Sequence, residues 1–373
     1  MKNNCNRLMK MKNLEKFSAG GIKRCAAIAM ASLLFATTGV SLTAQPVKAQ
    51  EISAFSGDSD IVIPSKDKIE IPETSKDAFK KYKEISGIGA NTILGADFTY
   101  YQQCLEWGKS YKNYMSQSVD NIFDYVKSQG INTISLKVAV NPTGENAYLS
   151  LDNAIKTLKA VKASKANLKT NLVLLYSDEM TYAGENGQKL PADWEKAEKA
   201  EQSVSRVESA KTYTKEIIAK LKQVNVRPDI VTIGNEVDWN FLGITAGEGW
   251  EGWKAMGDIS ALLKKEGVKN AVSIAAPSDA ASVKYIVQKL GYASVDYDYI
   301  GVNVYPDNNT NNYIKSLKKE VESCASDKQL IVSNVEYERV NEANTANVYT
   351  QADSIYNLLE ATIDEKNGML PFR

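Results

Sequence analysis

The 373-residue chain contains no histidine. This absence excludes catalysis by Ser-His-Asp or Cys-His groups, zinc sites of the HExxH type and any histidine general base. Acid–base chemistry then falls mainly to Asp, Glu, Lys and Tyr. A pair of carboxyl groups is the simplest arrangement that needs nothing else, so we expect neither a metal ion nor an organic cofactor.

An excess of charge of one sign is also missing, because 45 Lys and Arg residues balance 45 Asp and Glu residues. Nucleic acids bind to surfaces on which Lys and Arg cluster, so we expect no nucleic-acid partner. Hydrophobic residues make up 43% of the chain, which is enough to bury a full core. These properties are typical of an ordinary soluble enzyme.

Long apolar runs are absent except near the N-terminus. There, basic residues precede a run from Ala26 to about Ala36, and Val47-Lys48-Ala49 has the small-x-small form of a cleavage site before Gln50. The run is shorter than the roughly 20 apolar residues of a spanning helix. We predict that residues 1–49 are a signal peptide, and that the mature protein is secreted, extracellular, free of the membrane and monomeric. An uncleaved membrane anchor is the alternative.

Cysteine is scarce, with four in the chain. Cys5 and Cys25 fall inside the predicted signal peptide, which leaves Cys104 and Cys324 in the mature protein. Outside the cell this pair could form a disulfide, and two buried free thiols are the alternative.

The rest of the chain divides into two parts. Residues 50–84 are polar and interrupted by Ser, Asp, Lys and Pro, which predicts a linker. Residues 85–373 alternate between strand and helix patterns, which predicts a parallel sheet. The expected strands are Thr92–Asp97, Ile131–Val140, Leu168–Ser177, Asp229–Glu236, Ala271–Pro277, Tyr297–Pro306 and Gln329–Tyr337.

Seven strands are one fewer than a TIM (β/α)8 barrel requires, and about 290 residues suit that fold. We therefore predict an α/β TIM barrel whose eighth strand, near the final NGMLPFR, is short or missing. The alternative is a doubly wound open sheet, but no GxGxxG loop follows the first strand.

Two glutamates end strands of this predicted barrel. Glu236 closes the fourth strand, where period-two alternation places it on one face with Thr232 and Gly234, and Glu336 closes the seventh. By the same alternation Val332, Asn334 and Glu336 share a face. Functional side chains of a TIM barrel gather at the carboxyl ends of its strands. A single glutamate at a strand end is more often a solvated cap, but the pair on strands four and seven points to catalysis.

Seven segments of the chain, in this order, resemble the arabinogalactan endo-β-1,4-galactanases, glycoside hydrolase family 53. They are GAD (Gly95–Asp97), NTISLKV before Asn141-Pro142, LLYSD (Leu174–Asp178), LPADW (Leu190–Trp194), RPDIVTIGNE (Arg227–Glu236), DYIGVNVYP (Asp298–Pro306) and IVSNVEY (Ile331–Tyr337). This family belongs to a clan of retaining barrel glycosidases. The resemblance implies a secreted enzyme that hydrolyses a plant-type polysaccharide, most closely the β-1,4-galactan of arabinogalactan.

By this resemblance Glu236 would be the general acid/base and Glu336 the nucleophile. A retaining glycosidase holds two carboxyl groups about 5 Å apart, and repulsion between them keeps one proton on the pair, so no histidine is needed. Substrate-binding roles are expected for further polar and aromatic residues, each of which has a purely structural role as its alternative. They are Asp97, Lys137, Asp178, Asn235, Asn303, Tyr305 and Trp239.

The chain departs from the family where sugar subsites are built. Lys137 replaces an arginine, Ala139 an aromatic residue and Leu175 a histidine, and the segment VDWNFLGITAGEGW replaces a Trp-Pro segment after Glu236. Lysine is a point charge where arginine offers a two-pronged donor. Two other functions therefore stay open: a glycan-binding barrel without turnover, and a glycosidase of the same clan that acts on another sugar.

Overall fold

The computed structural model describes Ile85 and residues 92–371, with gaps at 114–116, 184–186, 201–204, 239, 246–249, 276–279, 305–309, 336–345 and 364–369. The predicted signal peptide and linker lie outside the described residues.

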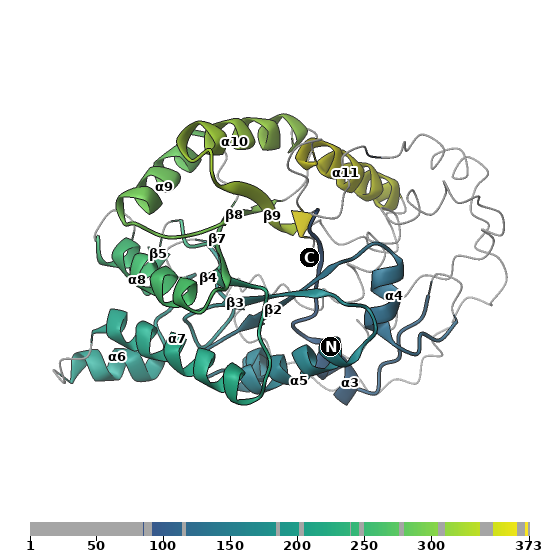
Figure 1. Ribbon diagram of the computed structural model, residues 1–373, viewed down its shortest axis with the longest axis horizontal. Helices are drawn as coiled ribbons and strands as arrows, with labels where there is room; N and C mark the ends of the chain where they lie inside the picture. Colours follow the sequence, from purple (N-terminus) through teal and green to yellow (C-terminus); the bar gives the residue numbers. More distant parts are fainter. Residues whose placement is uncertain are drawn as a thin grey trace, which may run out of the picture.

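Eight parallel strands form one curled sheet in the order β10-β1-β2-β3-β4-β7-β8-β9 (Figure 1). The strands are β1 (Leu94–Asp97), β2 (Thr133–Val138), β3 (Lys169–Leu174), β4 (Ile230–Ile233), β7 (Lys269–Ile274), β8 (Tyr299–Val304), β9 (Gln329–Val335) and β10 (Leu370–Pro371). A separate antiparallel pair, β5 (Asn240–Phe241) and β6 (Ile244–Thr245), follows β4.

Helices surround this sheet (Figure 1). They are α3 (Tyr101–Glu106), α4 (Ile122–Ser128), α5 (Leu151–Ala163), α6 (Ala192–Lys199), α7 (Arg206–Gln223), α8 (Glu251–Lys265), α9 (Ala280–Tyr292), α10 (Thr310–Cys324) and α11 (Ala346–Thr362), with a 3-10 helix, η1, at Gly144–Leu149. Several begin at side-chain caps: Asn121 accepts from Phe123 N at 2.9 Å, and Ser150 and Ser205 accept from the N3 backbone N–H groups of α5 and α7.

Side chains alternate between the helix layer and the barrel interior along each strand. On β2, Ile134, Leu136 and Val138 are buried in the large core between strands and helices, while Ser135 and Lys137 line an interior pocket. A second apolar cluster lies inside the barrel and is formed by Ile93, Ile230, Ala271, Tyr299 and Ile331. The strands are therefore buried on both faces, as parallel barrel strands require.

The expected face assignment on β9 is wrong for one residue. Val332 packs into the outer core, whereas Asn334 lines the interior pocket. The register with β8 shifts between Val302 and Asn303, so that Val302 pairs with Val332 but Asn303 pairs with Asn334. This bulge inserts Ser333 and breaks the period-two alternation from which the face was predicted.

The prediction of a TIM barrel with a short eighth strand is confirmed. The two residues of β10 pair with β1 through Leu94–Leu370 and Gly95–Pro371, and β10 lies beside β9 on its other side. Within the described residues no strand ladder joins β9 to β10. Because the sheet curls until its first and last strands meet, the open doubly wound sheet is excluded.

Two further expectations concern covalent and membrane attachment. Cys104 is buried in α3, Cys324 is half-buried at the end of α10, and neither forms a disulfide. Among the described helices, none combines the length and the apolar character that crossing a bilayer requires.

Candidate active site

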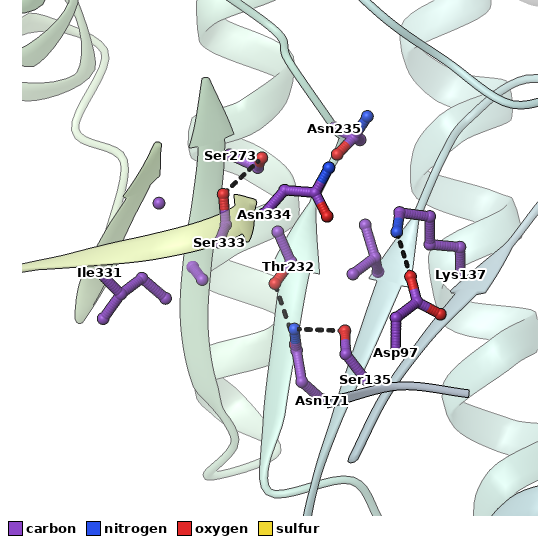
Figure 2. Close-up of a pocket in the computed structure, with 13 residues that line it drawn as sticks. Asp97, Ser135, Lys137, Asn171, Thr232, Asn235, Ser273, Ile331, Ser333 and Asn334 are labelled. Atoms are coloured by element: carbon purple, nitrogen blue, oxygen red, sulfur yellow. Dashed lines mark hydrogen bonds and ion pairs between the residues drawn. The ribbon is translucent and has the colours of Figure 1, made fainter. Parts of the chain in front are cut away.

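A pocket opens inside the barrel and is lined mainly by short polar side chains (Figure 2). The lining residues are Asp97, Ser135, Lys137, Asn171, Val173, Thr232, Asn235, Ala271, Ser273, Gly301, Ile331, Ser333 and Asn334. Bulky branched residues usually fill the interior of a TIM barrel. Here Ser, Thr and Asn take their place above the apolar cluster, so the interior next to the strand ends is polar.

Glu236 reaches this region through a turn rather than along a strand. β4 ends at Ile233, and both Gly234 (φ +70°) and Glu236 (φ +57°) have left-handed backbone conformations. A Cβ on Gly234 would lie 2.2 Å from a methyl carbon of Val237, so only glycine fits there. The left-handed conformation is unfavourable for Glu236 by about 1–2 kcal/mol, and strain of this kind is often found at functional sites.

Both carboxyl oxygens of Glu236 accept hydrogen bonds although the residue is only 7% exposed. The Asn303 amide at the end of β8 donates to Oε1, and the backbone N–H of Ala183 donates to Oε2 at 2.6 Å. These contacts come from two different segments of the barrel rim. The carboxyl group is thereby held in one orientation above the polar interior.

Asn235, immediately before Glu236, lines the pocket and is itself fixed by the loop after β3. Its Nδ2 donates to the carbonyl oxygen of Thr181 at 2.8 Å, and its own carbonyl oxygen accepts from Gln188 Nε2 at 2.8 Å. Gln188 also donates to the carbonyl oxygen of Glu236 at 3.2 Å. The loop after β3 therefore supports the turn that presents Glu236.

Asp97 and Lys137 form a buried ion pair across the ends of β1 and β2, with Nζ 2.5 Å from Oδ2 (Figure 2). The other Asp97 oxygen accepts from Thr99 N at 2.8 Å, and the Thr99 hydroxyl accepts from Lys137 N at 2.9 Å. Both residues line the pocket. Lys137, one of the positions at which the chain departs from the galactanase pattern, thus lies at the pocket.

Asp238 is a buried carboxyl group that the sequence did not single out. Its Oδ1 accepts from the backbone N–H of Ala275 at 2.8 Å, while Oδ2 has no hydrogen-bond partner among the described residues. Burial, reinforced by the charge of Glu236 and opposed by the Ala275 hydrogen bond, raises the pKa of Asp238 from its ordinary value of 3.8 to about 6. Its position two residues after Glu236 was the available signal.

Asp178 connects two loops of the barrel through its carboxyl group. Its two oxygens accept from the backbone N–H groups of Asn141 and Ala192, each at 2.9 Å, and Ala192 is the first residue of α6. Two aromatic residues that follow β4, Phe241 and Trp253, are buried in the outer core. They pack the loops onto the barrel, whereas Trp107 and Trp250 remain about half exposed.

Three of the predicted site residues, Glu336, Tyr305 and Trp239, lie outside the described residues. Of the others, the structure brings Asp97, Lys137 and Asn235 to the pocket and links Asn303 to Glu236. In the part of the chain that the structure describes, no group of three or more Cys, Asp or Glu side chains could hold a metal ion.

Comparison with known proteins gives the family of the chain. The model of the family described as glycosyl hydrolase family 53 matches residues 93–370. An arabinogalactan endo-beta-1,4-galactanase of Cellvibrio japonicus (strain Ueda107) is 26% identical over 235 residues, which cover 59% of each chain. A protein of the same description from Thermothelomyces thermophilus is 27% identical over 257 residues, covering 63% of this chain and 70% of that one.

The chain thus spans about three fifths of the length of the Cellvibrio relative. Among solved structures, the endo-beta1,6-glucanase BT3312 has a TM-score of 0.48 at 11% identity, over 78% of this chain and 68% of that chain. The family model covers the whole barrel from the residue before β1 to the first residue of β10. The chain belongs to glycosyl hydrolase family 53.

Proposed function

We propose that this protein is a secreted retaining endo-β-glycanase that hydrolyses β-1,4-galactan of the arabinogalactan type. The observation that carries the proposal is the placement of Glu236. A strained turn presents its carboxyl group at the carboxyl end of β4, and donors from two segments hold it over a polar barrel interior. Membership of glycosyl hydrolase family 53 and the named galactanase relatives support the substrate class.

The proposed reaction has two steps. In the first, Glu236 gives its proton to the glycosidic oxygen while the carboxylate of Glu336 attacks the anomeric carbon, so the C–O bond breaks and the leaving chain departs as an alcohol. In the second, Glu236 takes a proton from water, whose oxygen attacks the same carbon and releases Glu336. Asp97, Lys137 and Asn235, which line the pocket, would bind the sugar hydroxyl groups.

Reducing-sugar release from purified β-1,4-galactan tests this proposal. We expect release by the wild type and a loss of at least about 10³-fold in Glu236→Gln and Glu336→Gln, with the exposed Glu216→Gln on α7 as the matched control. Proton NMR of the first product should show the β-anomer. An initial α-anomer would refute the retaining mechanism, and no release from galactan would refute the substrate.

One observation favours a glycan-binding barrel without turnover as a second candidate. Lys137 stands where the resemblance to the galactanases implies an arginine, and Asp97 already engages its ammonium group. Affinity electrophoresis in galactan gels separates the two candidates. Retarded migration together with no hydrolysis in any of the variants or in the wild type would support the binding protein.

Export is also part of the proposal. Removal of residues 1–49 should leave a mature chain that begins at Gln50. Mass spectrometry of protein recovered from the culture medium tests the cleavage site. Light scattering of the same material should give the mass of one chain, since we propose a monomer.

A further inference from the structure

Apart from the Asp97–Lys137 pair and Asn235, the polar side chains inside the barrel form two separate hydrogen-bonded groups. In the first, Asn171 Nδ2 donates to the Ser135 hydroxyl at 3.2 Å, and the Thr232 hydroxyl donates to Asn171 Oδ1 at 2.9 Å (Figure 2). In the second, the hydroxyls of Ser273 and Ser333 lie 3.2 Å apart and both approach Asn303. Among the described contacts, only the second group reaches Glu236.

Ser333 occupies the interior because of two backbone features. The bulge on β9 turns Ser333 toward the pocket next to Asn334. On the neighbouring strand, Gly301 leaves the necessary space, since a Cβ there would lie 2.6 Å from Ser333 Cβ and 2.9 Å from its hydroxyl oxygen. A real side chain does not tolerate a contact of 2.6 Å, so a residue larger than glycine would displace Ser333.

The hydroxyl of Ser333 meets the amide oxygen of Asn303. Ser333 Oγ donates to Asn303 Oδ1 at 2.7 Å, and Ser273 Oγ reaches the same oxygen at 3.5 Å. A carboxyl oxygen that carries no proton can only accept a hydrogen bond, so Oε1 of Glu236 must face the NH2 side of the amide. With its oxygen satisfied by a serine donor, Asn303 presents NH2 to Glu236 while being only 1% exposed.

We infer that Ser333, assisted by Ser273, is a positioning residue that orients the Asn303 amide and thereby fixes the carboxyl group of Glu236. This inference rests on the proposed role of Glu236 as acid/base. Neither serine touches the substrate in this scheme. Ser333 acts through Asn303, whose Nδ2 binds Glu236 and whose Oδ1 accepts from Ser333 before the sugar arrives. Preorganised donors of this kind contribute to catalysis because they do not have to reorient during the reaction.

The test compares two substrates that differ in their need for a proton. In galactan the leaving group is a sugar alcohol, which requires protonation by the general acid. In a 2,4-dinitrophenyl β-galactobioside the leaving group is 2,4-dinitrophenolate, which departs without protonation. We expect Ser333→Ala and Asn303→Ala to lose about 10- to 100-fold in kcat/KM on galactan, part of the 10²- to 10⁴-fold that a general acid supplies. On the aryl substrate the first, bond-breaking step should change less than about threefold.

Ser128→Ala is the control, because it removes a serine hydroxyl that is exposed on α4, outside the pocket, where it donates to the carbonyl oxygen of Tyr125 at 2.6 Å. It should stay within about twofold of the wild type on both substrates. The double variant Ser333→Ala/Asn303→Ala should be no slower than Asn303→Ala alone, since the serine acts through the asparagine. Additive losses, or equal losses on both substrates, would overturn the inference.

If the wild type hydrolyses no β-glycan, the proposed function is refuted. The orientation of the Asn303 amide by Ser333 is then tested by structure instead of by activity. Crystal structures of the wild type and Ser333→Ala then decide it. The inference requires the Asn303 amide or the Glu236 carboxyl group to rotate out of hydrogen-bond distance in the variant. An unchanged Asn303–Glu236 contact in Ser333→Ala would overturn it.

Discussion

Asp238→Asn should raise the free energy of unfolding, relative to the wild type, by more at neutral pH than at acidic pH. Asp238 is 1% exposed, and burial raises its pKa from 3.8 to about 6. Between these values the folded protein holds a proton that the unfolded chain has already released. Unfolding therefore releases a proton in this window, so the stability of the wild type falls as the pH rises from 3.8 to about 6 and is level above it.

The stability that the wild type loses over this pH range should be about 3 kcal/mol. The pKa rises from 3.8 to about 6, and each pKa unit corresponds to about 1.4 kcal/mol. Asparagine keeps an acceptor for the Ala275 N–H but cannot ionise. The free energy of unfolding of Asp238→Asn minus that of the wild type should thus be about 2.5–3 kcal/mol more positive at pH 7 than at pH 3.5.

Urea denaturation at both pH values measures this difference. Comparison across pH cancels any fixed packing effect of the amide, since that effect is present at both values. The exposed Asp120→Asn, just before α4, controls for the loss of a carboxyl group as such. An equal change in stability at pH 3.5 and pH 7 for Asp238→Asn would refute the reasoning that burial keeps this group protonated.

Three more substitutions follow from the backbone and the core. Gly234→Ala should lower the free energy of unfolding by at least about 2 kcal/mol in urea denaturation, because Gly234 has a φ of +70° and a Cβ there would lie 2.2 Å from Val237 Cγ1. A stability equal to that of the wild type would show that the turn can rearrange. Glu236→Gly should be about 1 kcal/mol more stable than Glu236→Ala by the same method, since both lose the carboxyl group and only glycine relieves the left-handed backbone; the reverse order would argue against strain. Ile300→Ala, fully buried on β8, should lower the free energy of unfolding by about 2–5 kcal/mol, seen as a fall in the melting temperature; a loss under about 1 kcal/mol would mean that the core closes over the cavity.

Strands and helices with regular apolar patterns could be predicted from the sequence. The apolar residues of segment 151–163 recur at three- and four-residue spacing, which predicts a helix there. The helix α5 has these same bounds, and Ser150 caps its first turn. The alternation of Ile134, Leu136 and Val138 with polar residues likewise identified β2. In these segments local periodicity and tertiary packing agree.

The details of the site could not be predicted from the sequence, because they depend on irregular backbone conformations. Alternation was extended along β4 to Glu236, yet the strand ends at Ile233 and a turn carries the glutamate into place. The bulge that brings Ser333 and Asn334 to the pocket has no pattern of its own. The donor that Ala183 offers to Glu236 is its backbone N–H, so the residue type at position 183 does not predict this contact.

The short β10 has a consequence for how the barrel moves. Hydrogen bonds connect β10 to β1, but within the described residues no ladder crosses from β10 to β9, so those two edges are held together by contact alone. Amide groups on the β10 side of β9 should therefore exchange with deuterated solvent sooner than those shared with β8. Local opening of the contact between β9 and β10 would first affect β9, the strand whose bulge holds Ser333. It would reach β3 and β4, on the opposite side of the barrel, last.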